Sequence, residues 1–172
     1  LGTYETSDLS SYEEVKSEFR PFIFLANKIL SSNQNIGGLE ITINSDIPVG
    51  VGLGSSSACC VAATASISGL FNKLSHEEII NLAIEAEKTI FADTSGADTT
   101  VCTYGGIIEY PSIEKIDNTF ELNLVIANSM TPHSTKKSVE KVSKFKENYE
   151  ARFSQLCELE TKLIDEVIMN MK

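Results

Sequence analysis

The sequence predicts an α/β protein of the α+β kind, with helices and strands mixed along the chain. Apolar and polar side chains alternate over residues 38–46 and again over residues 120–128, which is typical of half-buried strands. Other stretches repeat their apolar side chains at helical spacing, as residues 76–91 do. With 172 residues, of which 42% are hydrophobic, the chain is long enough for one domain, or for one domain and part of another.

The first half of the chain divides at a glycine-rich segment. Residues 10–20 are polar and compatible with a helix, and Pro21 suits the first turn of a second helix over residues 21–32, where its missing N–H costs nothing. The strand at 38–46 leads into the glycines. After them, small side chains over residues 56–71 predict a helix that packs closely against its neighbours.

The second half opens with a well-marked helix. Ser75 and Glu78 have the spacing of a capping box, so a helix is expected over residues 76–91. A turn at 94–100 and strands at 105–110 and 120–128 follow. Helical spacing then runs from residue 134 onward, with one break expected in it. The change in composition near residue 120 is the best candidate for a domain boundary.

Composition excludes some classes of partner and predicts a location. A net charge of -10 provides no basic surface for a nucleic acid or an anionic membrane. No apolar run reaches the roughly 18 residues of a membrane span, and the first residues lack the features of a signal peptide. The four cysteines have neither metal-ligand nor CxxC spacing, which favours a reducing compartment. The sequence thus predicts a cytoplasmic protein.

The segment PVGVGLGSSSACC, residues 48–60, has the pattern of a phosphate-binding loop. Glycines between a strand and a helix let backbone N–H groups and the helix N-terminus approach a phosphate closely. The segment lacks the lysine of a Walker A loop and the third glycine of a dinucleotide fingerprint. It also lacks the GxSxG pattern of a nucleophile elbow. The alternative is an ordinary glycine-rich turn followed by a serine N-cap.

Glu87 falls inside the apolar arc of its predicted helix, between Ala83 and Phe91. A carboxylate there is unfavourable unless it is paired or coordinates a metal. Because carboxylate, hydroxyl and phosphate oxygens suit Mg²⁺, Ser56 and Glu87 are candidates to share one ion. The alternatives are an internal salt bridge, or a helix end that turns Glu87 toward solvent.

Two further segments carry candidate site residues. The turn TSGAD brings Asp98 just before a strand, where a carboxylate would be aimed into a cleft, although aspartates at turns are common for local reasons. The polar loop of residues 128–135 contains His133 and Thr135. A single histidine in such a loop is usually just solvated.

Together these residues resemble the GHMP kinases. Residues 48–58 are similar to the second motif of that superfamily, its ATP-phosphate loop. Within the superfamily the mevalonate kinases are most similar, because the run from Glu87 to Asp98, then residues 101–106 and 128–135, follow in the same order and spacing.

The resemblance implies a two-domain GHMP kinase fold with a mixed sheet. Residues 1–120 would form the remainder of the N-terminal, ATP-binding domain, and residues 121–172 the start of the C-terminal domain. The implied reaction is the MgATP-dependent phosphorylation of mevalonate to 5-phosphomevalonate, in the synthesis of isoprenoid and sterol precursors. Phosphomevalonate kinase, homoserine kinase and a catalytically incomplete nucleotide-binding fragment are the alternatives. The resemblance allows a homodimer and implies no nucleic-acid or membrane partner.

The resemblance also assigns roles to individual residues. Asp98 would be the catalytic carboxylate, Ser56 and Glu87 would hold Mg²⁺, and His133 and Thr135 would lie near the substrate, with His133 where other members have arginine. Thr94 stands where many mevalonate kinases have proline. The nucleotide would be bound by Gly50, Gly52, Leu53, Gly54, Ser55, Ser56 and Ser57. The first and third motifs of the family have no counterpart here, so the resemblance implies an internal piece of a longer kinase.

Overall fold

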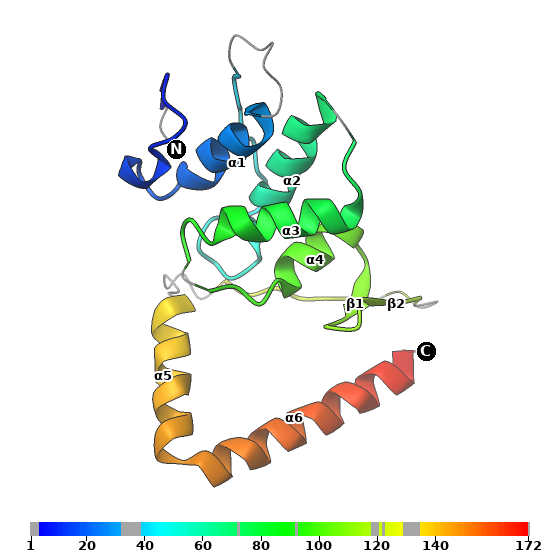
Figure 1. Ribbon diagram of the computed structural model, residues 1–172. Helices are drawn as coiled ribbons and strands as arrows, with labels where there is room; N and C mark the ends of the chain where they lie inside the picture. Colours follow the sequence, from blue (N-terminus) through cyan, green and yellow to red (C-terminus); the bar gives the residue numbers. More distant parts are fainter. Residues whose placement is uncertain are drawn as a thin grey trace. The chain divides into compact units, whose positions relative to one another are not determined.

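The computed structural model describes residues 4–31, 39–71, 73–91, 93–117, 121, 123–128 and 135–171 (Figure 1). The chain divides into two compact units, one of residues 1–49 and 53–105 and the other of residues 50–52 and 106–172. The elements, in chain order, are η1 (Tyr12–Glu14), α1 (Arg20–Leu30), α2 (Ser55–Gly69), α3 (His76–Glu87), α4 (Ala97–Tyr104), β1 (Ile107–Glu109), β2 (Glu114–Ile116), α5 (Thr135–Asn148) and α6 (Glu150–Met171).

The N-terminal helices agree only in part with the sequence prediction. Pro21 lies in the first turn of α1, as predicted, and is buried there. The helix predicted over residues 10–20 is wrong, because only the three-residue 3₁₀ helix η1 forms. Val15, which ends it, has extended dihedrals, and Arg20 Nε donates to the Val15 carbonyl at 2.9 Å. The Val15 carbonyl therefore accepts from the Arg20 side chain instead of from the backbone N–H of a continuing helix.

Helix α2 is the centre of the first unit. It packs against α1, α3 and α4 (Figure 1). Its small side chains let these helices approach closely. The buried core cluster combines α1, α2 and α3 through Leu25, Cys60, Ala63, Ile67, Ala83 and Ala86. The small-residue helix predicted from residue 56 is thus confirmed, with its start at Ser55.

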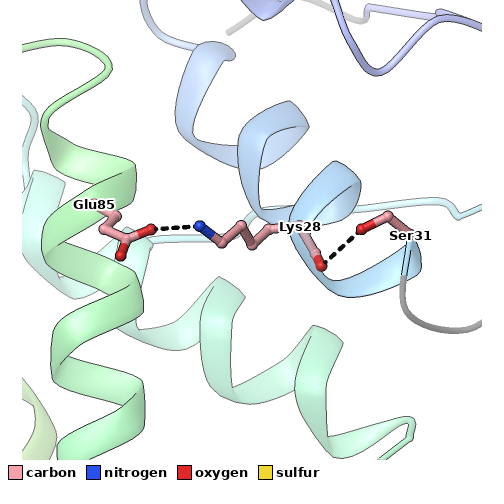
Figure 2. A network of polar contacts seen from close by, with 3 residues as sticks. All are labelled: Lys28, Ser31 and Glu85. Carbon is pink, nitrogen blue, oxygen red and sulfur yellow. Dashed lines mark hydrogen bonds and ion pairs between the residues drawn. The ribbon is translucent and has the colours of Figure 1, made fainter.

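A polar contact also joins α1 to α3 at the surface. Lys28 Nζ lies 3.0 Å from Glu85 Oε2, and the Ser31 hydroxyl donates to the Lys28 carbonyl at 3.1 Å (Figure 2). The Lys28 and Glu85 side chains are 56% and 50% exposed. Solvent-exposed ion pairs typically contribute about 0–1 kcal/mol, so the apolar core holds these helices together far more than this pair does.

Helix α3 begins as predicted and ends earlier than predicted. Ser75 and Glu78 form the capping box, with each side chain accepting from the other's backbone N–H. The helix stops at Glu87 instead of Phe91. The Thr89 hydroxyl donates to the Ala86 carbonyl at 2.7 Å, and the following N–H groups of Ile90 and Phe91 both turn to the Glu87 carbonyl. The α-helical bonding pattern ends at this point.

The sheet is smaller than predicted. The strand expected at 105–110 is confirmed as β1, which pairs antiparallel with β2 so that Ile107 lies opposite Ile116. The strands predicted at 38–46 and 120–128 are wrong for the residues described there, which belong to no ladder. A ladder needs a partner for its backbone groups, and Val125, at 97% exposed, has no cover within the described residues. Helices with a two-stranded antiparallel sheet confirm the α+β class, whereas the described residues do not form a mixed sheet.

The C-terminal part is helical, as the spacing predicts. The expected break lies at Tyr149, between α5 and α6. Its ring lies 5.4 Å from that of Phe145, measured between centroids, and its N–H donates to the Phe145 carbonyl at 2.9 Å. Among the helices of the described chain, none combines the length and the apolar character needed to cross a bilayer.

Candidate functional site

The glycine segment has the backbone conformation that only glycine adopts easily. Gly50, Gly52 and Gly54 have φ angles of 76°, 80° and 66°. Gly54 is the N-cap of α2, so the N–H groups of the first turn have no acceptor within the helix. Such a helix start attracts anions. Gly54, Glu87 and Asp98 belong to the first unit, whereas Gly50 and Gly52 belong to the second.

Asp98 lies in the first turn of α4, and not in a turn before a strand as the sequence analysis predicts. Gly96, with a φ of 79°, is the N-cap and turns the chain into this helix. The Thr100 N–H and the Thr100 hydroxyl both donate to the Gly96 carbonyl, at 2.9 and 2.8 Å. The helix start fixes the backbone of Asp98, while its side chain remains exposed.

The structure brings Asp98 to the start of α2. A Cβ atom added to Gly54 would lie 3.8 Å from both Cγ and Oδ2 of Asp98. The carboxylate therefore lies beside the N-terminus of the helix that follows the glycine segment, where the helix dipole favours negative charge. A phosphate bound at this helix start would lie close to Asp98.

Gly54→Ala is expected to destabilise the chain by about 1–2 kcal/mol, because alanine disfavours a positive φ. The added methyl group itself has room, since its closest neighbours lie at ordinary contact distance. Gly69→Ala in the same helix is the matched control: no positive φ is involved and nothing lies near its Cβ, so a gain of up to about 1 kcal/mol is expected. Urea unfolding of both variants measures the difference. Equal effects would contradict the conformational argument.

Glu87 is buried, only 3% exposed, as its place in the apolar arc predicts. Its carboxylate accepts hydrogen bonds from three hydroxyls: Ser57 Oγ donates to Oε1 at 2.5 Å, and Thr94 Oγ1 and Thr99 Oγ1 donate to Oε2 at 3.2 and 3.0 Å. These donors satisfy a buried carboxylate that lies among apolar helices. Neither alternative, a salt bridge or exposure to solvent, describes Glu87.

Thr99 and Thr94 are partners of Glu87 that the sequence pattern does not predict. The available signal was the density of hydroxyl side chains in TSGADTT, next to a carboxylate expected to be buried. Ser57, which the sequence does not single out as a partner of Glu87, also bonds it directly, and the shared magnesium ion expected of Ser56 and Glu87 stays a prediction. Ser56 is half-buried and comes one residue earlier in the same helical turn.

The donor atoms around Glu87 fit magnesium chemistry. Carboxylate and hydroxyl oxygens are the ligands that Mg²⁺ takes, usually together with water and phosphate oxygens. Among the described residues, no cluster of three or more histidine, cysteine, aspartate or glutamate side chains forms a metal site. An ion here would therefore depend on Glu87, on serine hydroxyls and on a bound phosphate.

The cysteines near the site are protonated at neutral pH. Burial, the nearby Glu87 charge and Cys59 raise the pKa of Cys60 to about 12. Burial also raises the pKa of Cys59, and burial with the charges of Asp98 and Glu87 raises that of Cys102. Because the thiolate is the nucleophilic form, these thiols are unsuited to covalent catalysis. Cys59, Cys60, Cys102 and Cys157 are all free thiols.

The other candidates lie elsewhere or outside the described residues. Leu53 is exposed at the end of the glycine segment. His133 lies outside the residues that the structure describes. Thr135 begins α5, and its side chain is likewise outside the description.

The helices that carry this site lie in a region that matches a known protein family. Residues 21–106 match the family model described as the GHMP kinases N terminal domain, so the chain belongs to this family. The match includes α1 from its second residue onward and all of α2 to α4, and with them Gly54, Glu87 and Asp98.

Curated relatives carry the name mevalonate kinase. That of Thermococcus sibiricus is 36% identical over 150 residues, which are 86% of this chain and 43% of the relative. That of Pyrococcus horikoshii is 35% identical over 164 residues, 94% of this chain and 48% of the relative. The mevalonate kinase of Arabidopsis thaliana is 33% identical over 144 residues, 75% of this chain and 37% of the relative. The chain thus spans less than half the length of these relatives.

Proposed function

We propose that the protein to which this chain belongs transfers the terminal phosphoryl group of ATP to the primary hydroxyl of mevalonate. The observation that carries the proposal is the Asp98 carboxylate beside Gly54, at the N-terminus of α2. At this place the N-terminus of α2 provides a group that attracts an anion, and the Asp98 carboxylate provides a group that can bond a hydroxyl. Membership of the GHMP kinase family and the names of the relatives support this substrate class.

The start of α2 and the glycine segment bind the phosphates. The N–H groups in the first turn of α2, which have no acceptor within the helix, and the helix dipole offset the negative charge, and glycine permits close approach of the backbone. The residues assigned to this role are Gly50, Gly52, Leu53, Gly54, Ser55, Ser56 and Ser57. Holding the phosphate in line with the acceptor provides much of the catalysis in phosphoryl transfer.

Asp98 acts on the acceptor hydroxyl. The hydroxyl oxygen attacks the terminal phosphorus, the bond from that phosphorus to the bridging oxygen of ADP breaks, and the hydroxyl proton passes to the Asp98 carboxylate. The exposed side chain leaves the carboxylate open to a substrate. Its place in the first turn of α4 fixes the backbone position from which the carboxylate extends.

Ser56 and Glu87 would hold Mg²⁺, as part of the same proposal. When bound, the ion neutralises charge on the phosphate oxygens. Glu87 provides the carboxylate, and α2 provides the hydroxyl together with the phosphate-binding N–H groups. His133 and Thr135 are assigned to the substrate side of the site. The proposal also keeps residues 1–120 as the N-terminal domain, residues 121–172 as the start of the next, and a cytoplasmic location.

An acceptor panel tests the proposal. The complete reading frame that contains this chain is incubated with MgATP and mevalonate, phosphomevalonate or homoserine, and ADP release is measured. We expect turnover with mevalonate. Turnover with only one of the other two acceptors would reassign the substrate within the family. Nucleotide binding by calorimetry without turnover on any acceptor would contradict the kinase assignment and favour a nucleotide-binding module.

A further inference from the structure

Glu87 connects three segments of the first unit through one carboxylate. Its two oxygens accept from Ser57 in the first turn of α2, from Thr99 in the first turn of α4 and from Thr94 in the segment before α4. Glu87 itself is the last residue of α3. One buried anion thus links the start of α2, the end of α3 and the start of α4.

We propose that Ser57 and Thr99 are positioning residues, which hold Asp98 beside the start of α2 through their shared bonds to Glu87. Thr99 directly follows Asp98 in α4, and Ser57 lies one helical turn after Gly54 in α2. A rotation of α4 that moves Asp98 away from Gly54 also pulls the Thr99 hydroxyl away from Glu87. The two hydrogen bonds therefore hold Asp98 in the position beside Gly54 that the proposed reaction uses.

Thr99 differs from the other buried threonines in the direction of its hydrogen bond. Thr64 and Thr100 donate to Cys60 and Gly96, which are carbonyls of the same local segment. Thr99 donates across helices, to a charged acceptor. Thr99 and Thr100 are adjacent and equally buried, 0% and 2% exposed, so only the partner of the hydroxyl distinguishes them.

The environment makes the Thr99 and Ser57 bonds strong constraints. Ser57, Glu87 and Thr99 are all shielded from water, and hydrogen bonds to a charged group in such surroundings are the stronger kind. A valine at position 99 keeps the shape of threonine and removes the donor. The carboxylate then loses one of its three partners, and α4 loses its side-chain hydrogen bond to α3.

The test compares Thr99→Val with Thr100→Val and Thr99→Ser, in the complete reading frame. For Thr99→Val we expect kcat to fall about 10- to 100-fold, because small misplacements of reacting groups cost this much, with KM for ATP and acceptor changed less than about threefold. Thr99→Ser keeps the donor and should restore kcat to within about threefold of wild type. Thr100→Val loses only the hydroxyl bond to the Gly96 carbonyl and keeps the backbone N–H bond that starts α4, so kcat should stay nearly unchanged. Equal losses in Thr99→Val and Thr100→Val, or no rescue by serine, would overturn the proposal.

A second measurement separates this proposal from the proposed function, on which its kinetic part rests. Amide chemical shifts of residues 54–58 are recorded by ¹⁵N NMR on the same variants, without any substrate. Thr99→Val is expected to shift these signals in α2, and Thr100→Val to leave them in place. If Thr99→Val shifts these signals but the wild-type protein has no kinase activity, the proposed reaction is refuted and the positioning role is kept. Unchanged shifts in Thr99→Val would refute the positioning role.

If Thr99→Val does not fold, Ser57→Ala removes the hydrogen bond from Ser57 to Glu87 instead, and the same quantities are measured. Its matched control is Ser68→Ala, since Ser68 is a buried serine of α2 whose hydroxyl donates to the Ala65 carbonyl of its own helix. Ser57→Ala is expected to shift the amide signals of Asp98 and Thr99, whereas Ser68→Ala should not. Equal changes in the two variants would refute the positioning role.

Discussion

Asp98→Asn is expected to lower kcat by about 10²- to 10⁴-fold, the usual contribution of a positioned proton acceptor. Asparagine has nearly the same shape, so α4 and its contact with Gly54 should persist. It cannot take up the proton of the acceptor hydroxyl. Affinity for ATP should change little, because backbone N–H groups at the start of α2 are assigned to the phosphates.

Steady-state kinetics and nucleotide calorimetry on the complete reading frame measure these two effects. Asp165→Asn is the charge-matched control, since Asp165 is an exposed aspartate of α6 with no assigned role. Turnover close to wild type in Asp98→Asn would remove the catalytic role. A parallel loss of ATP affinity would instead indicate that the carboxylate acts on the bound nucleotide.

Local signals in the sequence predict the elements that depend on local chemistry. The capping box at Ser75, the proline in the first turn of α1 and the small residues of α2 each act within one or two helical turns, and each is confirmed. The apolar arc of α3 likewise predicts the burial of Glu87 correctly.

The failures concern contacts between distant segments. Alternation over residues 38–46 and 120–128 is compatible with a strand, but a strand forms only where a second one supplies backbone partners. The start of α4 depends on a positive φ at Gly96, which a turn would also use. The hydroxyls around Glu87 come from three separate segments, so no spacing rule pairs them.

The three hydroxyls that bond Glu87, which form a hydroxyl cage around its carboxylate, give this residue a structural role beside the metal role that the resemblance implies. The bonds from Ser57, Thr94 and Thr99 already stabilise the charge without an ion. A magnesium ion would add to this arrangement through lone pairs that the hydroxyls leave free, or would replace one of them. Removal of the charge and removal of the whole side chain should therefore have different effects, and each can be measured separately.

Glu87→Ala is expected to destabilise the first unit by about 3 kcal/mol or more. The buried hydroxyls of Ser57 and Thr99 and the half-buried hydroxyl of Thr94 lose their acceptor, and a cavity opens at the end of α3. Glu87→Gln keeps the volume and one carbonyl oxygen, and the hydroxyls can turn to accept from its amide, so a loss of about 1–2 kcal/mol is expected. Urea unfolding compares the two variants. A fully stable Glu87→Ala would show that the hydroxyl cage contributes little to folding.

Glu87→Gln also tests the metal role, because it removes a charge that attracts the ion and leaves most of the packing. The Mg²⁺ concentration for half-maximal activity should rise about tenfold, as expected if the charge contributes about 1.4 kcal/mol to binding. Glu85→Gln is the matched control, since Glu85 belongs to the same helix but lies half-exposed beside Lys28, and its magnesium titration should not change. An unchanged titration in Glu87→Gln with lowered stability would make Glu87 a structural residue. Serine hydroxyls and phosphate oxygens would then be left to bind the ion.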